Sequence, residues 1–122
     1  KYVKRGKVHG SEQDLVRAIM EYLDLWKVPH VHIRNVGAII RTYGKGLVRL
    51  GKGRVTQVGV PDLVANRNGR MVAIETKSVT GKLESEQIVW LLNHKKNFGA
   101  VITPRTLEEF VAAWEEIEGF GA

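Results

Sequence analysis

Two apolar runs between residues 60 and 77 are separated by the dipeptide Asn68-Gly69. This dipeptide favours a two-residue type I′ turn, because both residues tolerate the positive φ angles that the turn requires. The pattern therefore predicts a β-hairpin, and the short turn determines which residues of its two strands face each other. In this register Asp62 lies opposite Glu75, and Lys77 lies on the same face of the second strand.

The two facing acids repel each other, because Cβ atoms at facing positions are only about 5 Å apart. A divalent cation would compensate for this repulsion, since Mg²⁺ and Mn²⁺ bind hard oxygen ligands and reverse the sign of the local field. The alternative is a surface network of two acids and a lysine that adds little to stability. The register of the hairpin and the basic character of the chain favour the metal site.

The length and composition are those of one globular domain, which we expect to span residues 1–122. Hydrophobic residues make up 43% of the chain and charged residues 26%, which are ordinary globular values. The chain has no cysteine, so disulfides and thiolate zinc sites are excluded. No apolar run approaches the roughly 20 residues needed to cross a bilayer, so we expect a soluble, cytoplasmic protein with no membrane partner.

The net charge of +6 is unevenly distributed along the sequence. Residues 1–10 form a basic arm, and residues 26–60 contain no acid, whereas the last predicted helix is rich in glutamate. A localised basic surface points to a polyanionic partner, although a solvated basic loop without a partner is the alternative. The cations of the acid-free stretch are Lys27, Arg34, Arg41, Lys45, Arg49, Lys52 and Arg54.

The remaining patterns predict an α/β fold, a mixed β-sheet flanked by helices in the order α-β-β-β-α-β-α. Ser11 starts the first helix, whose apolar face extends to Trp26 and whose first turn directs Glu12 inward. For Glu12 alone, stabilisation by the helix dipole is as good an explanation as a functional role. Further elements are a strand at 30–36 with Val31 on its apolar side, helices at 85–98 and 106–118, and a strand at 100–103.

The helix at 85–98 is expected to pack through one stripe and to end at Gly99. The stripe consists of Ile88, Leu91, Leu92 and Lys95. Because this helix connects two strands, the crossover favours parallel pairing between them. The tryptophans Trp26, Trp90 and Trp114 lie in or near apolar stripes, so core packing is a better explanation for each than base stacking.

The sequence Pro61-Asp62 followed by Glu75-Thr76-Lys77 resembles the signature of the PD-(D/E)XK nuclease superfamily. Further elements in the same order resemble the virus-type replication-repair nuclease (VRR-NUC) family, over about residues 11–103. These elements are Glu12 in an early helix, Asn35-Val36-Gly37, Gly59-Val60-Pro61-Asp62, Ile74-Glu75-Thr76-Lys77-Ser78, Gly81-Lys82-Leu83 and Gln87.

The resemblance implies that Asp62 and Glu75 are metal carboxylates and that the Thr76 carbonyl is a further ligand. It also implies that Lys77 is the catalytic lysine. The side chain of Thr76 departs from the family pattern, in which an apolar residue is more common at this position.

Two further residues take roles from the resemblance. Glu12 would support the metal site from the first helix. Gln87 would act in catalysis near the metal and the phosphate, although a polar contact at the start of its helix is nearly as good an explanation.

The activity implied by the resemblance is that of a Mg²⁺- or Mn²⁺-dependent endonuclease of bacterial or phage-encoded type, without a small-molecule cofactor. It would hydrolyse phosphodiester bonds in branched or junction DNA during replication, repair or recombination, as a homodimer. The alternatives are a non-catalytic DNA-binding module with the same fold and an RNA-directed nuclease. The expected nucleic-acid contacts are Arg34, Asn35, Lys45, Arg49, Lys52, Arg54 and Lys82.

Overall fold

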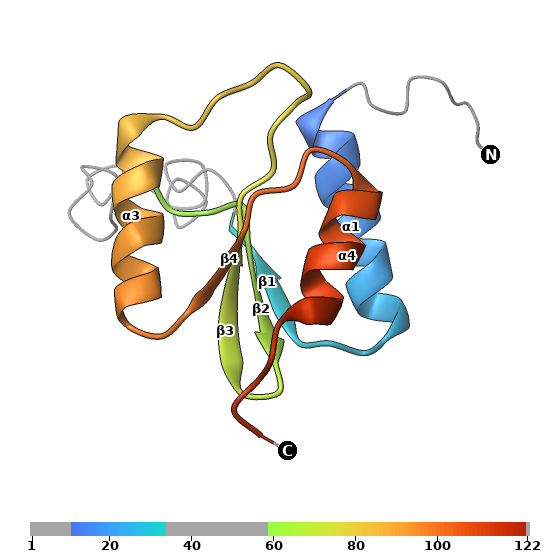
Figure 1. The fold of residues 1–122 in the computed structure, drawn as a ribbon. Helices are drawn as coiled ribbons and strands as arrows, with labels where there is room; N and C mark the ends of the chain where they lie inside the picture. Colours follow the sequence, from blue (N-terminus) through green and yellow to red (C-terminus); the bar gives the residue numbers. More distant parts are fainter. Residues whose placement is uncertain (1–10, 34–58, 122) are drawn as a thin grey trace, which may run out of the picture.

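The computed structural model describes residues 11–33 and 59–121. The elements follow the predicted order α-β-β-β-α-β-α (Figure 1), and none of the helices in the described part is long and apolar enough to span a membrane. Their bounds are α1 (Glu12–Leu25), β1 (His30–His32), β2 (Leu63–Arg67), β3 (Arg70–Ile74), α3 (Ser85–Lys96), β4 (Ala100–Ile102) and α4 (Leu107–Glu116).

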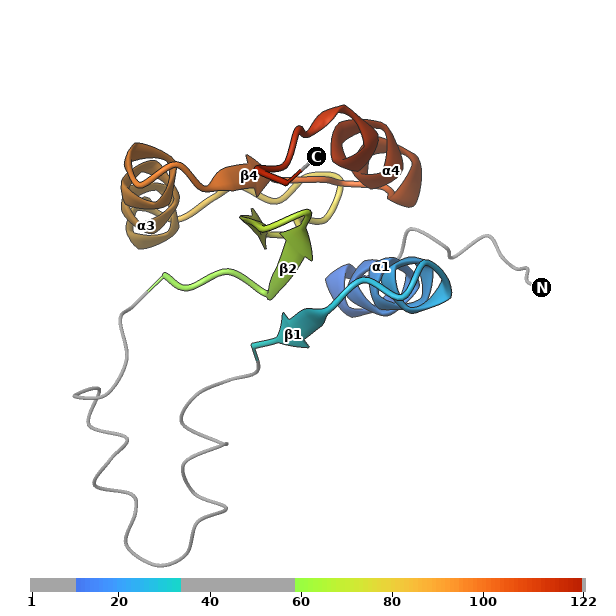
Figure 2. The ribbon, with the colours of Figure 1, turned by 90° about the horizontal axis from the view of Figure 1, so that it is seen from below.

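The strands form a mixed sheet in the order β1-β2-β3-β4. The pairs β1/β2 and β2/β3 are antiparallel, whereas β3 and β4 are parallel and are connected through α3, as the crossover predicted. Helices α1 and α4 cover one face of the sheet, and α3 lies on the other side (Figures 1 and 2). The fold is therefore α/β with three layers, consistent with a PD-(D/E)XK nuclease.

The hairpin has the predicted register. Asn68 and Gly69 form its turn with φ angles of 49° and 91°, and Leu63 pairs with Ile74 at the far end of the ladder. Asp62 and Glu75 are the next residues beyond that last pair. The turn chemistry alone therefore brings the two acids to the same end of the sheet.

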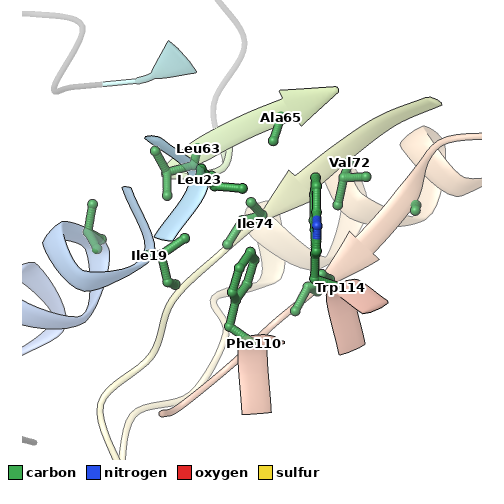
Figure 3. Close-up of a cluster of buried hydrophobic side chains, with 11 residues drawn as sticks. Ile19, Leu23, Leu63, Ala65, Val72, Ile74, Phe110 and Trp114 are labelled. Carbon is green, nitrogen blue, oxygen red and sulfur yellow. The ribbon is translucent and has the colours of Figure 1, made fainter. Parts of the chain in front are cut away.

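The main core lies between the sheet and the helices α1 and α4 (Figure 3). It is centred on Phe110, whose ring stacks on Trp114 at a centroid distance of 5.7 Å. The core residues are Val16, Ile19, Leu23, Leu63, Ala65, Val72, Ile74, Ala100, Ile102, Phe110 and Trp114. Ser11 and Thr106, the first residues of the two predicted helices, are the N-caps of α1 and α4, and each side chain accepts a hydrogen bond from the backbone amide three residues on.

Several packing predictions are wrong. Trp26 is 65% exposed because α1 ends at Leu25, one residue before it, so the helical periodicity no longer applies. Val31 is also exposed. It pairs with Val64 on the sheet face opposite the main core, whereas His30 pairs with the buried Ala65 and is half-buried on the core side.

The predicted stripe of α3 is wrong in part, because Leu91 is buried but Ile88 and Leu92 are exposed. The end of this helix also differs from the prediction, since the left-handed conformation belongs to Phe98 (φ 68°) and not to Gly99. Gly99 instead allows a close approach, because a Cβ atom there would overlap the ring of His94.

The C-terminal tail packs on the hairpin turn. The backbone amides of Phe120 and Gly121 donate to the Asn68 carbonyl at 2.9 and 2.8 Å. Arg67 donates from Nε to the carbonyl of Ile117 at 3.2 Å, and its guanidinium lies 5.2 Å from the centroid of the Trp114 ring. A cation from the hairpin therefore stabilises the C-terminal end of α4.

Because of this packing, there is less room for a side chain at Gly119 than at Gly121. A Cβ atom at Gly119 would lie 2.3 Å from the Arg67 carbonyl oxygen, whereas one at Gly121 would lie 3.5 Å from that of Asn68. We expect Gly119→Ala to lower the free energy of unfolding by about 1–3 kcal/mol through overpacking. Gly121→Ala should leave it nearly unchanged in the same urea denaturation experiment. Equal stability of the two variants would contradict the packing of the tail on the turn.

Candidate active site

The candidate site lies at the end of the hairpin opposite its turn, where β2 begins and β3 ends. Asp62 directly precedes β2 and Glu75 directly follows β3. The chain after β3 continues beside the end of β4, because the Glu75 amide donates to the Ile102 carbonyl at 3.0 Å and the Lys77 amide to the Pro104 carbonyl at 3.2 Å. Hydrogen bonds of the sheet therefore hold the backbone of the site residues in place.

Asp62 is held through one of its two carboxylate oxygens. Its Oδ2 accepts hydrogen bonds from the Thr76 amide at 2.9 Å and from the Thr76 hydroxyl at 2.7 Å. Thr76 is fully buried, so its hydroxyl is shielded from water. The two donors constrain the orientation of the carboxylate.

Glu75 is held through its Oε2 atom. This atom accepts a hydrogen bond from Gln87 Nε2 at 2.5 Å and lies 3.6 Å from Lys77 Nζ. Gln87 is itself oriented, because its Oε1 accepts from the Glu84 amide at 2.8 Å in a capping box at the start of α3. Gln87 therefore makes the polar contact at the start of its helix and also contacts Glu75, while its role in catalysis stays a prediction.

The other oxygen of this carboxylate is the most unusual atom of the site. Glu75 is only 3% exposed, and its Oε1 is buried without a hydrogen-bond partner among the residues that the structure describes. The pKa of Glu75 is raised from 4.5 to about 7, first by burial and then by the charge of the nearby Asp62, while Lys77 opposes this shift. The site thus holds a buried carboxylate whose charge the described residues do not fully compensate.

A divalent cation fits this donor set. Hard cations bind carboxylate oxygens, and a cation near Oε1 would both satisfy that atom and reduce the repulsion between Glu75 and Asp62. Within residues 11–33 and 59–121, however, no three acidic or histidine side chains lie close enough together to bind one ion. The fit therefore rests on Glu75 and Asp62.

Glu12 contacts the loop that follows Lys77. Its Oε2 accepts a hydrogen bond from the Ser78 amide at 3.2 Å. Arg105, which the sequence reasoning missed, holds the same loop from the other side: its NH1 donates to the carbonyl of Ser78 and, at 3.2 Å, to that of Val79. A lone arginine after a strand has no recognisable sequence signal, so this role emerges only from the tertiary structure.

Of the expected nucleic-acid contacts, Lys82 lies in the described part of the chain. Lys82 is exposed in the loop between β3 and α3. The other six residues lie outside the described part of the chain, as does the basic arm at 1–10; the six are Arg34, Asn35, Lys45, Arg49, Lys52 and Arg54.

A comparison with protein families identifies the chain. The family model described as archaeal Holliday junction resolvase (Hjc) matches residues 31–108, which is well over half of the sequence. The chain belongs to the archaeal Holliday junction resolvase family. Searches of curated proteins and of solved structures found no match.

Membership of the Hjc family confirms the PD-(D/E)XK type of nuclease and the fold that was expected from the sequence. The match does not identify the VRR-NUC branch in particular. It covers Asp62, Glu75, Lys77 and Gln87 but starts after α1, so Glu12 lies outside it. Hjc resolvases are structure-selective endonucleases, which makes branched DNA the substrate class of this family member.

The raised pKa of Glu75 predicts how the stability of this Hjc-family protein depends on pH when no metal is bound. Below pH 4.5 the carboxyl group is protonated in both the folded and the unfolded state. Between pH 4.5 and about 7 the unfolded state loses this proton while the folded state keeps it. The free energy of unfolding should therefore fall over this range, by up to about 3 kcal/mol at roughly 1.4 kcal/mol per pKa unit.

Chemical denaturation of the wild type and of Glu75→Gln in EDTA, from about pH 4 to pH 8, isolates this contribution. The glutamine oxygen can still accept the hydrogen bond from Gln87, so the variant removes the charge and keeps the contact. The variant should become more stable than the wild type as the pH rises. A difference between the two proteins that stays constant with pH would contradict the burial of an ionised Glu75.

Proposed function

We propose that this chain is a Mg²⁺- or Mn²⁺-dependent endodeoxyribonuclease that resolves Holliday junctions and related branched DNA. One observation carries the proposal: the buried Glu75 carboxylate, whose Oε1 has no hydrogen-bond partner among the described residues, lies beside Asp62 and Lys77 in a chain of the Hjc family. Within the superfamily, we assign the chain to the VRR-NUC type on the sequence elements described above.

The metal would be held by Asp62, by Oε1 of Glu75 and by the Thr76 carbonyl. The hairpin register supports the use of this carbonyl, because continuing it two residues beyond the last observed pair, Leu63 and Ile74, would bring Thr76 opposite Pro61. In an antiparallel hairpin, hydrogen-bonded and non-hydrogen-bonded pairs alternate, starting from the hydrogen-bonded pair next to the turn. By this count Thr76 and Pro61 would form a hydrogen-bonded pair, but Pro61 has no N–H to donate to the Thr76 carbonyl. When bound, the metal would supply a more acidic water and neutralise charge on the phosphate oxygens.

The protein side chains prepare this site. Gln87 fixes Oε2 of Glu75, so that Oε1 remains as the atom that faces the metal position. Lys77 is only 11% exposed and lies 3.6 Å from the same carboxylate, which keeps its ammonium group at the site. From there it would orient the attacking water or neutralise the attacked phosphate. Glu12 supports the site indirectly, through the loop at Ser78.

Recognition of the DNA would rely on phosphate contacts from the basic residues, including Lys82. Such contacts position the DNA without reading its sequence, which suits an enzyme that recognises the shape of a junction. We propose a homodimer with two-fold symmetry, because it would present two active sites to two strands of the junction.

Cleavage of a labelled four-way DNA junction, a linear duplex of the same sequences and a matched RNA junction tests this function. With Mg²⁺ or Mn²⁺ we expect cuts in the DNA junction, weak or no cutting of the duplex, and none in EDTA. Binding that falls steeply with salt, without cleavage under any metal, would instead indicate a non-catalytic DNA-binding module. Preferential cutting of the RNA junction would indicate an RNA-directed nuclease.

A further inference from the structure

The middle residue of the Glu75-Thr76-Lys77 segment is a buried, polar side chain. Thr76 has no exposed surface, and its hydroxyl donates to Oδ2 of Asp62 at 2.7 Å. A buried hydroxyl needs a hydrogen-bond partner, and here the partner is a carboxylate of the candidate metal site. Such charge-assisted hydrogen bonds are stronger than those between neutral groups.

The backbone of Thr76 binds the same oxygen atom. If the ladder continued beyond its last pair, Leu63 and Ile74, the Thr76 amide would donate to the carbonyl of Pro61. It donates instead to Oδ2 of Asp62 at 2.9 Å. The Asp62 carboxylate thus replaces a backbone acceptor at the point where the two strands stop pairing.

These contacts give the two carboxylate oxygens of Asp62 different roles. Both donors of Thr76 converge on Oδ2, and two donors in different directions limit rotation of the carboxylate. The amide is present whatever the side chain, so the hydroxyl is the contribution specific to threonine. With Oδ2 engaged, Oδ1 is the oxygen left to bind a cation.

We propose that the Thr76 hydroxyl is a positioning group that orients Asp62 so that its Oδ1 binds the metal as a single-oxygen ligand. The role rests on the proposed function, because it acts through a metal ligand and not on the DNA. Partners that orient a ligand in this way typically change metal affinity by about 10- to 100-fold when they are removed.

The test is the affinity of the DNA-free protein for Mn²⁺, measured by isothermal titration calorimetry. Thr76→Val keeps the branched shape and removes the hydroxyl, and it should weaken Mn²⁺ binding about 10-fold or more. Thr76→Ser keeps the hydroxyl, so its affinity for Mn²⁺ should lie within about threefold of the wild-type affinity, a smaller change than that expected for Thr76→Val. Thr103→Val makes the same hydroxyl-to-methyl change at an exposed position after β4 and should have no effect. If Thr76→Val does not fold by circular dichroism, Thr76→Ala serves in its place with the same expected loss.

Cleavage of the junction at increasing Mn²⁺ gives a second readout. A positioning role predicts that Thr76→Val needs more Mn²⁺ but approaches the wild-type rate at saturation, whereas a defect of folding would lower that rate at every Mn²⁺ concentration. The proposal would be overturned if folded Thr76→Val bound Mn²⁺ as tightly as the wild type, or if Thr76→Val and Thr76→Ser lost equal affinity for Mn²⁺. In either case, junction cleavage by the wild type would leave the proposed function intact. A wild type that binds Mn²⁺ but cuts no junction would instead overturn the function.

Discussion

Replacing Glu75 with glutamine should reduce junction cleavage by roughly a thousandfold or more, which corresponds to about 4 kcal/mol of transition-state stabilisation. The substitution removes the charge that would bind the cation, at a position that is almost fully buried. It preserves the shape of the side chain and the hydrogen bond from Gln87. The measurement is the single-turnover rate on a four-way junction with saturating Mn²⁺.

The matched control is Glu86→Gln, which makes the same change on an exposed acid in the first turn of α3. This variant should cleave like the wild type. Because Glu75→Gln should also be more stable than the metal-free wild type near neutral pH, a loss of activity could not be attributed to unfolding. Undiminished cleavage by Glu75→Gln would remove Glu75 from the active site.

Replacing Lys77 with alanine should reduce the same rate by roughly 100- to 1000-fold, or about 3–4 kcal/mol. Lys77 contributes the cation nearest to Glu75 within the described residues, at 3.6 Å, and its side chain is largely buried. Lys77→Arg should recover only part of the activity, because a planar guanidinium does not reproduce a compact ammonium charge.

The pH dependence of stability in EDTA separates the charge of Lys77 from simple loss of packing. Lys77 lowers the pKa of Glu75 in the metal-free protein, so its removal should raise that pKa and extend the fall in the free energy of unfolding to higher pH. Lys96→Ala, at an exposed lysine in the last turn of α3, should leave both the cleavage rate and the pH dependence of stability unchanged. A full wild-type rate in Lys77→Ala would contradict the assignment.

Local chemistry explains what could be predicted from the sequence. The turn at Asn68-Gly69 requires only the conformational freedom of two residues, and a two-residue turn has one register. The alignment of Asp62 with Glu75 therefore followed without any knowledge of the tertiary fold. The caps at Ser11 and Thr106 are equally local, since each involves a backbone amide only three residues away.

Packing predictions were less reliable because periodicity reports which residues share a face, and not what covers that face. The stripe of α3 has a helical period, yet Leu91 alone is buried from it, while Ile88 and Leu92 are exposed. The core packing predicted for Trp26 is wrong for a related reason. Helix α1 ends at Leu25, one residue before Trp26, so the helical period no longer applies there.

The sequence by itself determined the hairpin, its register and the proximity of Asp62, Glu75 and Lys77, because all three follow from one short turn and strand alternation. Only the tertiary structure decided how these groups are held. Gln87 reaches Glu75 from the start of α3, Glu12 reaches the Ser78 amide from α1, and the Thr76 hydroxyl turns to Asp62. Contacts between separate elements depend on how those elements pack, and no local pattern of residues encodes that packing.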